Sequence, residues 1–423
     1  MSHAADPSTA EPQAAPDLQV AGVGAWGPEP EFAEVDVAGN RMRLFVESPE
    51  YVAALTADLR RAEKRIWIES YIVADDEVGR ALAEALKARA TAGVKCRLMY
   101  DAVGSVATPA EFFRELQESG VELHAYRTLW SVFWKYRFLR RFNRRNHRKL
   151  VVIDDDTAYF GGMNFADPGS SLRPSKRQQV AEGESSPKGS EATPYWRDLH
   201  VRLQGPRQAE IAEMMQALWM RRDKHRPRNA VASLSRFAAS PQDGLFFFDA
   251  HPRRRYRRAS KIFRTMIGRA RREITTAMAY FIPTGGVLRA LLKARERKVQ
   301  TRVVVPGRSD VAAVQWAARH LYPQLLRRGV RIYERRERML HAKVMVIDGR
   351  DTIVGSCNID PRSLLTNLEF IAIIRSRELA EQAAAFCEYE RRQADPVHMR
   401  DLETLPWWKR QLQKAAFYFK RWL

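Results

Sequence analysis

One pattern of residues occurs twice in this chain, about two hundred positions apart, and it constrains the fold more than any other feature. The first copy consists of His147, Lys149, Asp154, Gly161, Gly162 and Asn164, and the second of His341, Lys343, Asp348, Gly355, Ser356 and Asn358. In both copies Lys follows His by two residues, Asp follows Lys by five, Gly follows Asp by seven and Asn follows that Gly by three. Equal spacing throughout indicates an internal duplication.

The segments that lead to the two motifs repeat the same order of expected elements. In each half an amphipathic helix leads to an apolar strand, RIWIESYIV or EITTAMAYFI, and then to a second helix, a second strand, a third helix and a short strand. Runs of β-branched and aromatic residues that alternate with amphipathic helices are typical of α/β layering. The sequence therefore predicts an α/β fold built from two similar halves.

Composition divides the chain into four expected regions. Pro, Ala and Ser dominate residues 1–30, so we expect a disordered leader there. These residues lack the basic segment and apolar core of a secretory signal. Residues 31–230 and 231–400 are expected to form the two lobes, and residues 401–423 form a basic amphipathic C-terminal segment. Two insertions break the symmetry, a basic and aromatic stretch at 130–145 and a polar loop at 167–194.

The charge balance favours an anionic partner. The chain has 71 Lys and Arg against 50 Asp and Glu, a formal net charge of +21, which suits nucleic acid or an anionic membrane. No stretch reaches the ~18 consecutive apolar residues of a membrane span, so a membrane role would be peripheral. Three cysteines far apart in the sequence, without a CxxC pair, predict neither disulfides nor zinc and fit a reducing compartment.

The His and Lys of each motif suit phosphate chemistry. They are two residues apart at the start of a strand, so they share one face. Lys offers a compact positive charge to phosphoryl oxygens, and a neutral His can attack phosphorus or, once charged, give up a proton. Cleavage of a phosphodiester without a metal needs both a nucleophile and a general acid, which two such sets would supply together. No third His or Cys stands at ligand spacing, so we expect no metal and no cofactor.

The pattern HxKxxxxD followed by GGMN or GSCN resembles the phospholipase D superfamily, over roughly residues 40–400. The resemblance implies two pseudo-symmetric lobes, each a mixed β-sheet flanked by helices, with the active site at the lobe interface. It also implies a covalent phospho-histidine, for which we expect His147 as nucleophile and His341 as acid and then base. Asn164 and Asn358 are expected to bind phosphate, while Asp154 and Asp348 complete the catalytic motifs and are expected to support strand and loop.

The resemblance further implies a carboxylate downstream of each motif that orients a His. The candidates are Asp198 in YWRDLHVRL and Glu369 in NLEFIAII, because a carboxylate that accepts the far ring N–H fixes the tautomer and raises the basicity of the ring. The alternative is an exposed acid at the start of a strand, or a partner for Arg197. Gly162 departs from the usual Ser, so a hydroxyl present in the second half is missing from the first.

The continuation GSCNIDPRSLLTNLEF at 355–370, together with NHRK and WRDLH, is similar to bacterial cardiolipin synthases, which transfer a phosphatidyl group from one phosphatidylglycerol to an alcohol of another lipid. This similarity implies an anionic phospholipid substrate, a peripheral location on the cytoplasmic side of the bacterial cell membrane, and no nucleic acid. A phospholipase D-type hydrolase, a phosphatidylserine synthase and a nuclease of the superfamily remain alternatives. A binding protein without catalysis is disfavoured by two complete motifs.

Two aromatic and basic stripes bear on membrane contact. Trp130, Trp134, Phe138 and Phe142 are spaced by four residues in the first insertion, and Trp408, Leu412, Ala415, Phe419 and Trp422 follow helical spacing in the C-terminal segment. Aromatic side chains among cations on a short amphipathic helix suit an anionic interface. The alternative is that both stripes pack on the core of the protein or on a second chain.

Overall fold

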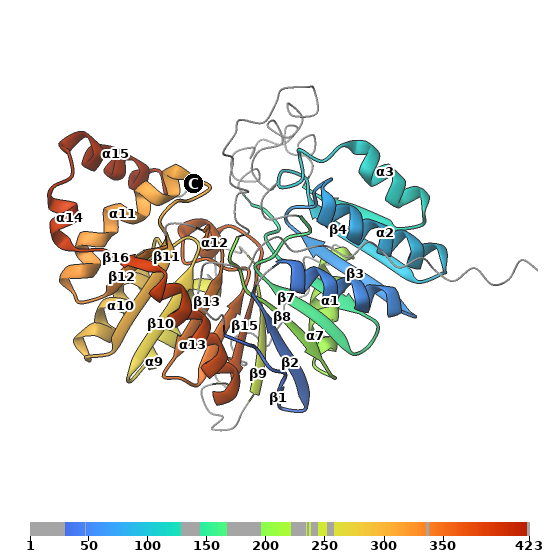
Figure 1. The fold of residues 1–423 in the computed structure, drawn as a ribbon, viewed down its shortest axis with the longest axis horizontal. Coiled ribbons are helices and arrows are strands. Elements are labelled where there is room, and N and C mark those ends of the chain that lie inside the picture. The colour runs from blue at the N-terminus through green and yellow to red at the C-terminus, as the bar shows by residue number, and fades with distance from the viewer. Residues whose placement is uncertain are drawn as a thin grey trace, which may run out of the picture.

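Two eight-stranded sheets stand side by side in the computed structural model, one from each half of the chain (Figure 1). The structure describes residues 30–46, 48–127, 144–166, 196–220, 234, 237, 244–251, 258–335 and 338–420. The predicted α/β fold with two lobes is confirmed. The expected leader, the two insertions and the stretch between the lobes fall almost entirely outside the described residues.

The N-terminal sheet has the order β1-β2-β8-β7-β6-β3-β4-β5. Its strands are β1 (Val35–Val37), β2 (Asn40–Phe45), β3 (Arg65–Ser70), β4 (Lys95–Asp101), β5 (Glu122–Tyr126), β6 (Leu150–Ile153), β7 (Thr157–Gly161) and β8 (His200–Gln204). The C-terminal sheet has the order β16-β12-β11-β10-β13-β14-β15-β9. Its strands are β9 (Gly244–Ala250), β10 (Glu273–Met278), β11 (Gln300–Pro306), β12 (Arg331–Arg335), β13 (Lys343–Ile347), β14 (Asp351–Gly355), β15 (Glu369–Arg375) and β16 (Ala394–Pro396).

Seven strands of each sheet correspond, because the order β5-β4-β3-β6-β7-β8-β2 matches β12-β11-β10-β13-β14-β15-β9. The first three strands of each series run parallel, and the remaining pairs are antiparallel. Parallel neighbours need helical crossovers, whereas antiparallel neighbours can join through a short turn. Each motif therefore begins at the antiparallel strand, β6 or β13, that pairs with β3 or β10, at the same place in both lobes.

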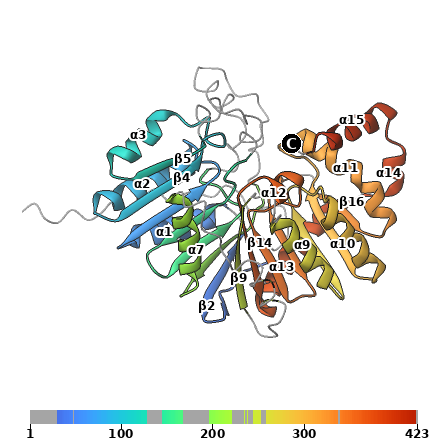
Figure 2. The ribbon, with the colours of Figure 1, turned by 180° about the vertical axis from the view of Figure 1, so that it is seen from behind.

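Helices cover the outer faces of both sheets, and the inner faces share one core. The outer helices are α1 (Ser48–Arg61), α2 (Glu77–Thr91) and α3 (Ala110–Glu118) in the first lobe, and α9 (Arg258–Arg269), α10 (Gly285–Glu296) and α11 (Ala312–Arg327) in the second (Figure 2). Apolar residues of both sheets, of α7 (Gln208–Trp219) and of α13 (Arg377–Arg392) form a common cluster between the lobes. The lobes are thus parts of one packed unit.

A buried ion network also joins the lobes. Nε of Arg197, in the first lobe, lies 2.7 Å from one oxygen of Glu390 on α13, and Nε of Arg335 lies 3.2 Å from the other. All three side chains are fully buried. Charges removed from water in this way need such mutual pairing, so the network fixes how the lobes meet.

The C-terminal segment packs along α11 as two helices, α14 (Met399–Glu403) and α15 (Trp407–Tyr418). Ala416 and Phe417 face the core, and the ring of Phe417 lies 4.8 Å from that of His320. Trp408, Leu412 and Phe419 are exposed on the other side of the helix. Within the residues described, no helix is both long and apolar enough to cross a bilayer.

Candidate active site

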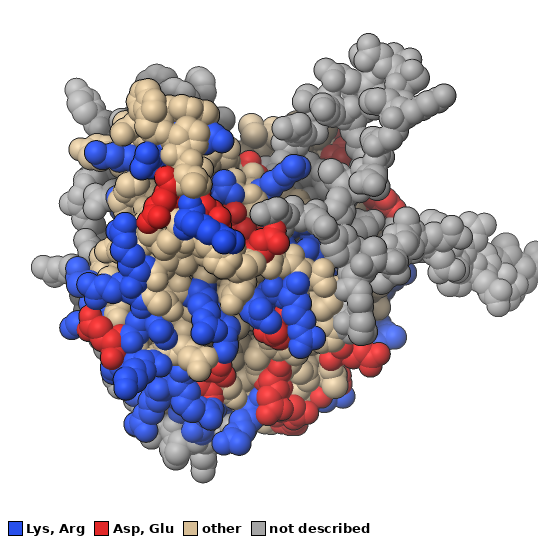
Figure 3. Space-filling view, turned by 60° about the vertical axis from the view of Figure 1, so that its left-hand side comes forward, with Lys and Arg blue, Asp and Glu red and all other residues tan. Residues whose placement is uncertain are grey.

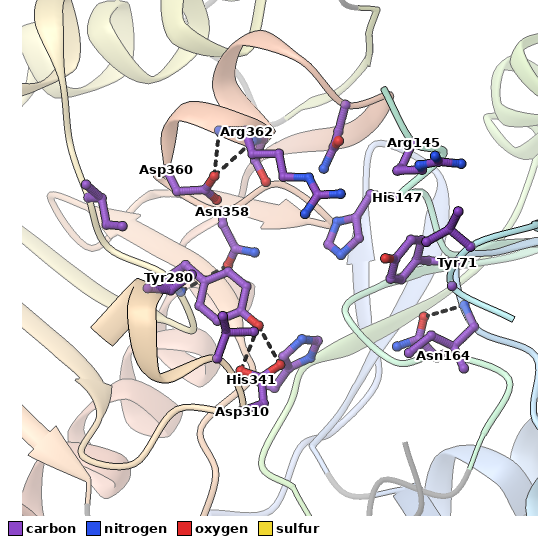
Figure 4. A pocket seen from close by; sticks show the side chains of 18 of the residues that line it. Tyr71, Arg145, His147, Asn164, Tyr280, Asp310, His341, Asn358, Asp360 and Arg362 are labelled. Carbon is purple, nitrogen blue, oxygen red and sulfur yellow. Dashed lines mark hydrogen bonds between the residues drawn. The ribbon is translucent and has the colours of Figure 1, made fainter. Parts of the chain in front are cut away.

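A cavity of about 260 Å³ opens between the lobes, and both motifs contribute to its wall (Figure 4). His147, Asn164, His341 and Asn358 line it. This volume lies below the ~300–1,000 Å³ of pockets that enclose drug-sized ligands, so a two-chain lipid could place only its head group inside.

Backbone hydrogen bonds exchanged between the lobes set the positions of the two histidines. His147 N donates to Leu368 O at 3.0 Å, and Leu368 N donates to Arg145 O at 2.8 Å. In the same way His341 N donates to Arg197 O at 2.6 Å. Each histidine is therefore held next to the segment that carries the carboxylate of the opposite lobe.

The histidine side chains also make their hydrogen bonds to the opposite lobe. His147 Nδ1 lies 3.1 Å from Glu369 Oε2 and 3.1 Å from Ser356 O. A carbonyl oxygen can only accept, so Nδ1 carries the proton and Nε2 keeps its lone pair on the pocket side. Ser356 Oγ donates to Glu369 Oε2 at 2.5 Å, so this hydroxyl serves the carboxylate.

His341 is held by an aspartate where His147 is held by a glutamate, and the lysine of the second motif also lies close to that aspartate. His341 Nδ1 lies 2.6 Å from Asp198 Oδ2, and Lys343 Nζ lies 3.5 Å from the same oxygen. Asp198 occupies the space that a side chain at Gly162 would need, since a Cβ there would lie 2.0 Å from Asp198 Oδ1. The first motif thus has Gly162 in place of a serine because Asp198 fills the space that a serine side chain would need.

Neither alternative for these two acids agrees with the structure. Asp198 and Glu369 are buried, and Arg197 pairs with Glu390 on the other lobe. The motif glycine Gly161 also has a steric reason, because a Cβ there would lie 2.4 Å from Leu199 O on the approach to β8. Gly161 thus lets the backbone approach the neighbouring strand, and Gly162 leaves room for Asp198.

The two halves differ electrostatically. Burial and the charges of Lys149 and Lys343 hold the pKa of His147 well below its ordinary value. Burial and Lys343 also lower the pKa of His341, but the Asp198 carboxylate opposes that change. Burial alone would raise the pKa of Asp198, yet Lys343 and His341 hold it below its ordinary value. Burial raises the pKa of Glu369 to about 7.

The two lysines also differ. Lys149 Nζ donates to His147 O at 2.8 Å and lies 5.2 Å from the centre of the Tyr71 ring. Burial and the charge of Lys343 lower the pKa of Lys149 to about 7. Burial likewise lowers the pKa of Lys343, against the charge of Asp198. An anion in the cavity would offset this desolvation and favour the charged form of both lysines.

The two motif asparagines are oriented by backbone amides. Ile72 N donates to Asn164 Oδ1 at 3.2 Å, and Tyr280 N donates to Asn358 Oδ1 at 3.3 Å. Because each amide oxygen is occupied in this way, each Nδ2 group is the part left to donate into the cavity.

The motif aspartates stand apart from this group, in the supporting position that the sequence led us to expect. Asp154 and Asp348 sit in the tight turns that follow β6 and β13, with left-handed φ values of 49° and 54°. The Asp154 carboxylate accepts from the backbone N–H groups of Glu63, Lys64 and Arg65 at 2.7–3.0 Å. Asp348 makes the corresponding bonds to residues 271–273. Both support the strand and its turn, at the strand end away from the cavity.

We expect Asp154→Asn to lower stability and to spare the chemistry. Asn tolerates the left-handed conformation but offers one acceptor oxygen where the carboxylate offers two, so one exposed or half-buried N–H loses its protein partner at a cost of about 0.5–1.5 kcal/mol. Urea unfolding should shift to a lower midpoint, while kcat per folded molecule stays within twofold. A large loss of kcat in fully folded protein would place Asp154 back in the catalytic group.

The structure adds residues that the sequence reasoning did not single out. Tyr71, Arg145, Trp196, Tyr280, Asp310 and Arg362 line the cavity. The rings of Tyr71 and Trp196 lie 5.1 and 4.9 Å from those of His147 and His341. Tyr71 follows β3 by one residue and Tyr280 follows β10 by two, so the duplication does not pair them: the position equivalent to Tyr280 in the first lobe is Ile72. Asp310 has no sequence signature either. Within the described residues, no cluster of three or more His, Cys, Asp or Glu side chains could hold a metal.

Duplicated lobes that bring the histidine and the asparagine of both motifs to one cavity, with each motif lysine beside its histidine, define a phospholipase D-like protein. Residues 55–174 and 263–389 match the family described as "Cardiolipin synthase, PLD-like domain". Cardiolipin synthase B of Escherichia coli K12 is 32% identical over 404 residues, which cover 90% of this chain and 88% of that protein. The chain therefore belongs to the cardiolipin synthase family of phospholipase D-like enzymes.

Two further comparisons agree with this placement. A cardiolipin synthase of Halalkalibacterium halodurans is 28% identical over 380 residues, 88% of this chain and 70% of that protein. The crystal structure of a phosphatidylserine synthase from Haemophilus influenzae Rd KW20 superposes with a TM-score of 0.62 and 14% identity, covering 93% of this chain and 97% of that one. At this level of identity the superposition shows the shared fold.

Proposed function

We propose that this protein transfers a phosphatidyl group from phosphatidylglycerol to an alcohol of a second phospholipid, as a cardiolipin synthase does. The observation that carries the proposal is the pairing of two histidines that line one cavity, each held by a carboxylate of the opposite lobe, with the lysine of each motif close to its own histidine. The relatives named cardiolipin synthase support the choice of a phospholipid substrate.

The electrostatics favour His147 as the nucleophile. Its ring stays neutral because burial and nearby lysines disfavour the cation, and the proton on Nδ1 leaves Nε2 ready to attack phosphorus. The phosphorus–oxygen bond to glycerol then breaks, and His341 gives its proton to the leaving oxygen. The ionised Asp198 stabilises the protonated form of His341, which suits an acid.

The second step reverses these roles. The hydroxyl of the acceptor lipid gives its proton to His341 and attacks the phosphorus, and the bond between phosphorus and His147 Nε2 breaks. Lys149, Lys343 and the Nδ2 groups of Asn164 and Asn358 donate to the phosphoryl oxygens throughout. With water as acceptor the same steps give phosphatidic acid, so a hydrolase differs only in what reaches the phospho-histidine.

Incubation of the purified protein with phosphatidylglycerol vesicles, followed by mass spectrometry, tests this function. Cardiolipin and glycerol in equal amounts are expected. Phosphatidic acid as the sole lipid product would establish a hydrolase instead. A parallel incubation with single-stranded DNA should leave the DNA intact, and its cleavage at a comparable rate would favour the nuclease alternative.

The acid limb of the pH profile should report Glu369. His147 needs an ionised acceptor on Nδ1, and Glu369, with its pKa raised to about 7 by burial, loses that charge below this pH. We expect kcat/KM to rise with pH through a midpoint near 7. Glu369→Gln should give a lower rate without this limb, because its amide cannot ionise. An unchanged midpoint in Glu369→Gln would assign the limb to another group.

We also propose that the protein contacts the cytoplasmic side of a bacterial membrane peripherally, through the C-terminal helix. Of the nine large apolar side chains exposed in the described part of the chain, seven lie on α11 or α15 or at their ends, and Trp407 is 71% exposed. Lys409, Arg410 and Lys414 are exposed beside them on α15. Lys and Arg also spread widely over this side of the C-terminal lobe (Figure 3).

The position of this surface fits the delivery of a lipid. Lys420, which follows α15, lines the cavity, and so does Val311, which precedes α11 and is itself exposed. The exposed apolar side chains of α11 and α15 therefore lie on helices whose ends reach the rim of the cavity. A bilayer that binds α15 would present its head groups close to the two histidines.

Replacement of Trp408, Leu412 and Phe419 by Ser should weaken binding to anionic vesicles about tenfold or more, because each side chain loses apolar area that would enter the interface. Sedimentation with vesicles rich in phosphatidylglycerol measures this effect. The double variant Val106→Ser/Met220→Ser removes exposed apolar groups elsewhere and should bind normally. Equal binding by the triple variant and the wild type would refute the role of α15.

A further inference from the structure

One group in the cavity has a charge that opposes the binding of a phosphate. Asp310 follows β11 and lines the cavity on the side of His341 (Figure 4). A carboxylate at this place repels an anionic phosphodiester in a partly desolvated site. Its presence therefore needs a reason other than recognition of the phosphate.

A structural role in capping a helix or forming an ion pair does not explain Asp310. The helix α11 is preceded by Val311, and no side chain caps its first turn. Asp310 forms no ion pair within the described part of the chain, and its carboxylate accepts from the Tyr280 hydroxyl at 2.7 and 2.6 Å and from the Ser309 hydroxyl at 3.1 Å. Asp360, the other acid lining the cavity, differs because it caps α12 (Pro361–Leu365).

Charge in the cavity is divided between its two sides. Arg145 and Arg362 stand on the side of His147, whereas Asp310 and Tyr280 stand on the side of His341 (Figure 4). The duplication does not repeat this acid. Four residues after the end of β4 the first lobe has Ser105, and its hydroxyl accepts from Val73 N at 3.0 Å. The acid belongs only to the histidine that we assign to proton transfer.

We propose that Asp310, oriented by Tyr280, binds the hydroxyl groups of the glycerol unit that leaves or enters beside His341. This inference rests on the proposed transfer reaction. The leaving group of phosphatidylglycerol is glycerol, and the acceptor presents a glycerol unit as well, so both steps place neighbouring hydroxyls here. A carboxylate has about four lone-pair sites, so one that accepts from Tyr280 and Ser309 still keeps room for a further donor, and bonds to a charged acceptor are strong.

The proton balance is unaffected by this contact. The reacting hydroxyl of the acceptor gives its proton to His341, its oxygen bonds to phosphorus, and the bond from phosphorus to His147 breaks. Asp310 accepts a hydrogen bond from the neighbouring hydroxyl and takes no proton. Water lacks that second hydroxyl, so Asp310 favours a polyol over water as the acceptor.

The partition of the phosphatidyl group between glycerol and water tests the proposal. Full-length protein is supplied with phosphatidyl-p-nitrophenol, whose leaving group is not a polyol, at a fixed concentration of glycerol. The products, phosphatidylglycerol and phosphatidic acid, are counted from the same reaction, so their ratio does not depend on the amount of active enzyme. We expect Asp310→Asn to lower this ratio about tenfold or more, since the amide loses a charged acceptor.

Two variants complete the design. Tyr280→Phe keeps the acid but removes the hydroxyl that orients it, so its ratio should fall by a smaller factor. Asp155→Asn removes an exposed acid paired with Lys64 and should keep the ratio of the wild type. If Asp310→Asn slows both products equally, the inference is wrong and the transferase stands. If the wild type forms only phosphatidic acid, with glycerol or with phosphatidylglycerol as acceptor, the proposed transfer itself fails.

Discussion

His147→Ala and His341→Ala should each lower turnover of phosphatidylglycerol about ten-thousand-fold or more. When two residues act as one catalytic unit, removal of either one abolishes the rate enhancement that both provide. Both rings stand at a cavity wall, so their removal should leave the fold intact by circular dichroism and thermal unfolding. His124→Ala, a change on β5 outside the cavity lining, is the matched control and should retain wild-type turnover. Near-normal turnover by either pocket variant would refute the scheme with two histidines.

The same two variants also separate the roles. A donor with a good leaving group, such as phosphatidyl-p-nitrophenol, needs little help from an acid. His341→Ala should therefore release one equivalent of p-nitrophenol and accumulate a phosphatidyl group on His147, detectable by mass spectrometry. His147→Ala should show neither. The reverse outcome would assign the attack to His341.

Gly162→Ser should lower kcat/KM about a thousandfold, although Ser is the usual residue here in the phospholipase D superfamily that the motif resembles. A Cβ at this position would lie 2.0 Å from the Asp198 carboxylate, which must then move away from His341. Loss of the group that orients a catalytic histidine is costly because the wrong tautomer becomes accessible.

Two controls accompany this change. Gly268→Ala adds a Cβ where no atom lies within 4 Å and should be neutral. Ser356→Gly, the reverse change in the second lobe, removes a hydroxyl bond to Glu369 without adding bulk, and we expect a loss of about tenfold. A fully active Gly162→Ser would show that Asp198 can shift without consequence for His341.

Much of the architecture could be predicted from the sequence, because the periodicity of apolar residues and the spacing of motifs are local properties of the chain. The repeated spacing of the motifs and the shared order of helices and strands predicted the two α/β lobes. The exposed stripe on α15 followed from helical spacing as well, since Trp408, Leu412 and Phe419 recur on one face. The residue types of the motif, His, Lys and Asn, were enough to indicate phosphate chemistry.

The sequence also carried both orienting acids, yet it could not pair them with their histidines. Asp198 and Glu369 each follow a motif of their own lobe, but Asp198 holds His341, 143 positions away, and Glu369 holds His147, 222 positions away. This exchange depends on how two sheets meet across a shared core, which no local pattern encodes. The same holds for Asp154, whose carboxylate is occupied by amides about ninety residues away.

The sequence by itself thus determined the duplication, the chemical groups and the class of reaction they suit. Only the tertiary structure decided which acid faces which histidine, why Gly162 must be small, and where the second lobe places Asp310. These are questions of distance and burial between segments far apart in the chain. They depend on the packing of both lobes into one core, whereas the motifs depend on strand and helix periods that are written along the chain.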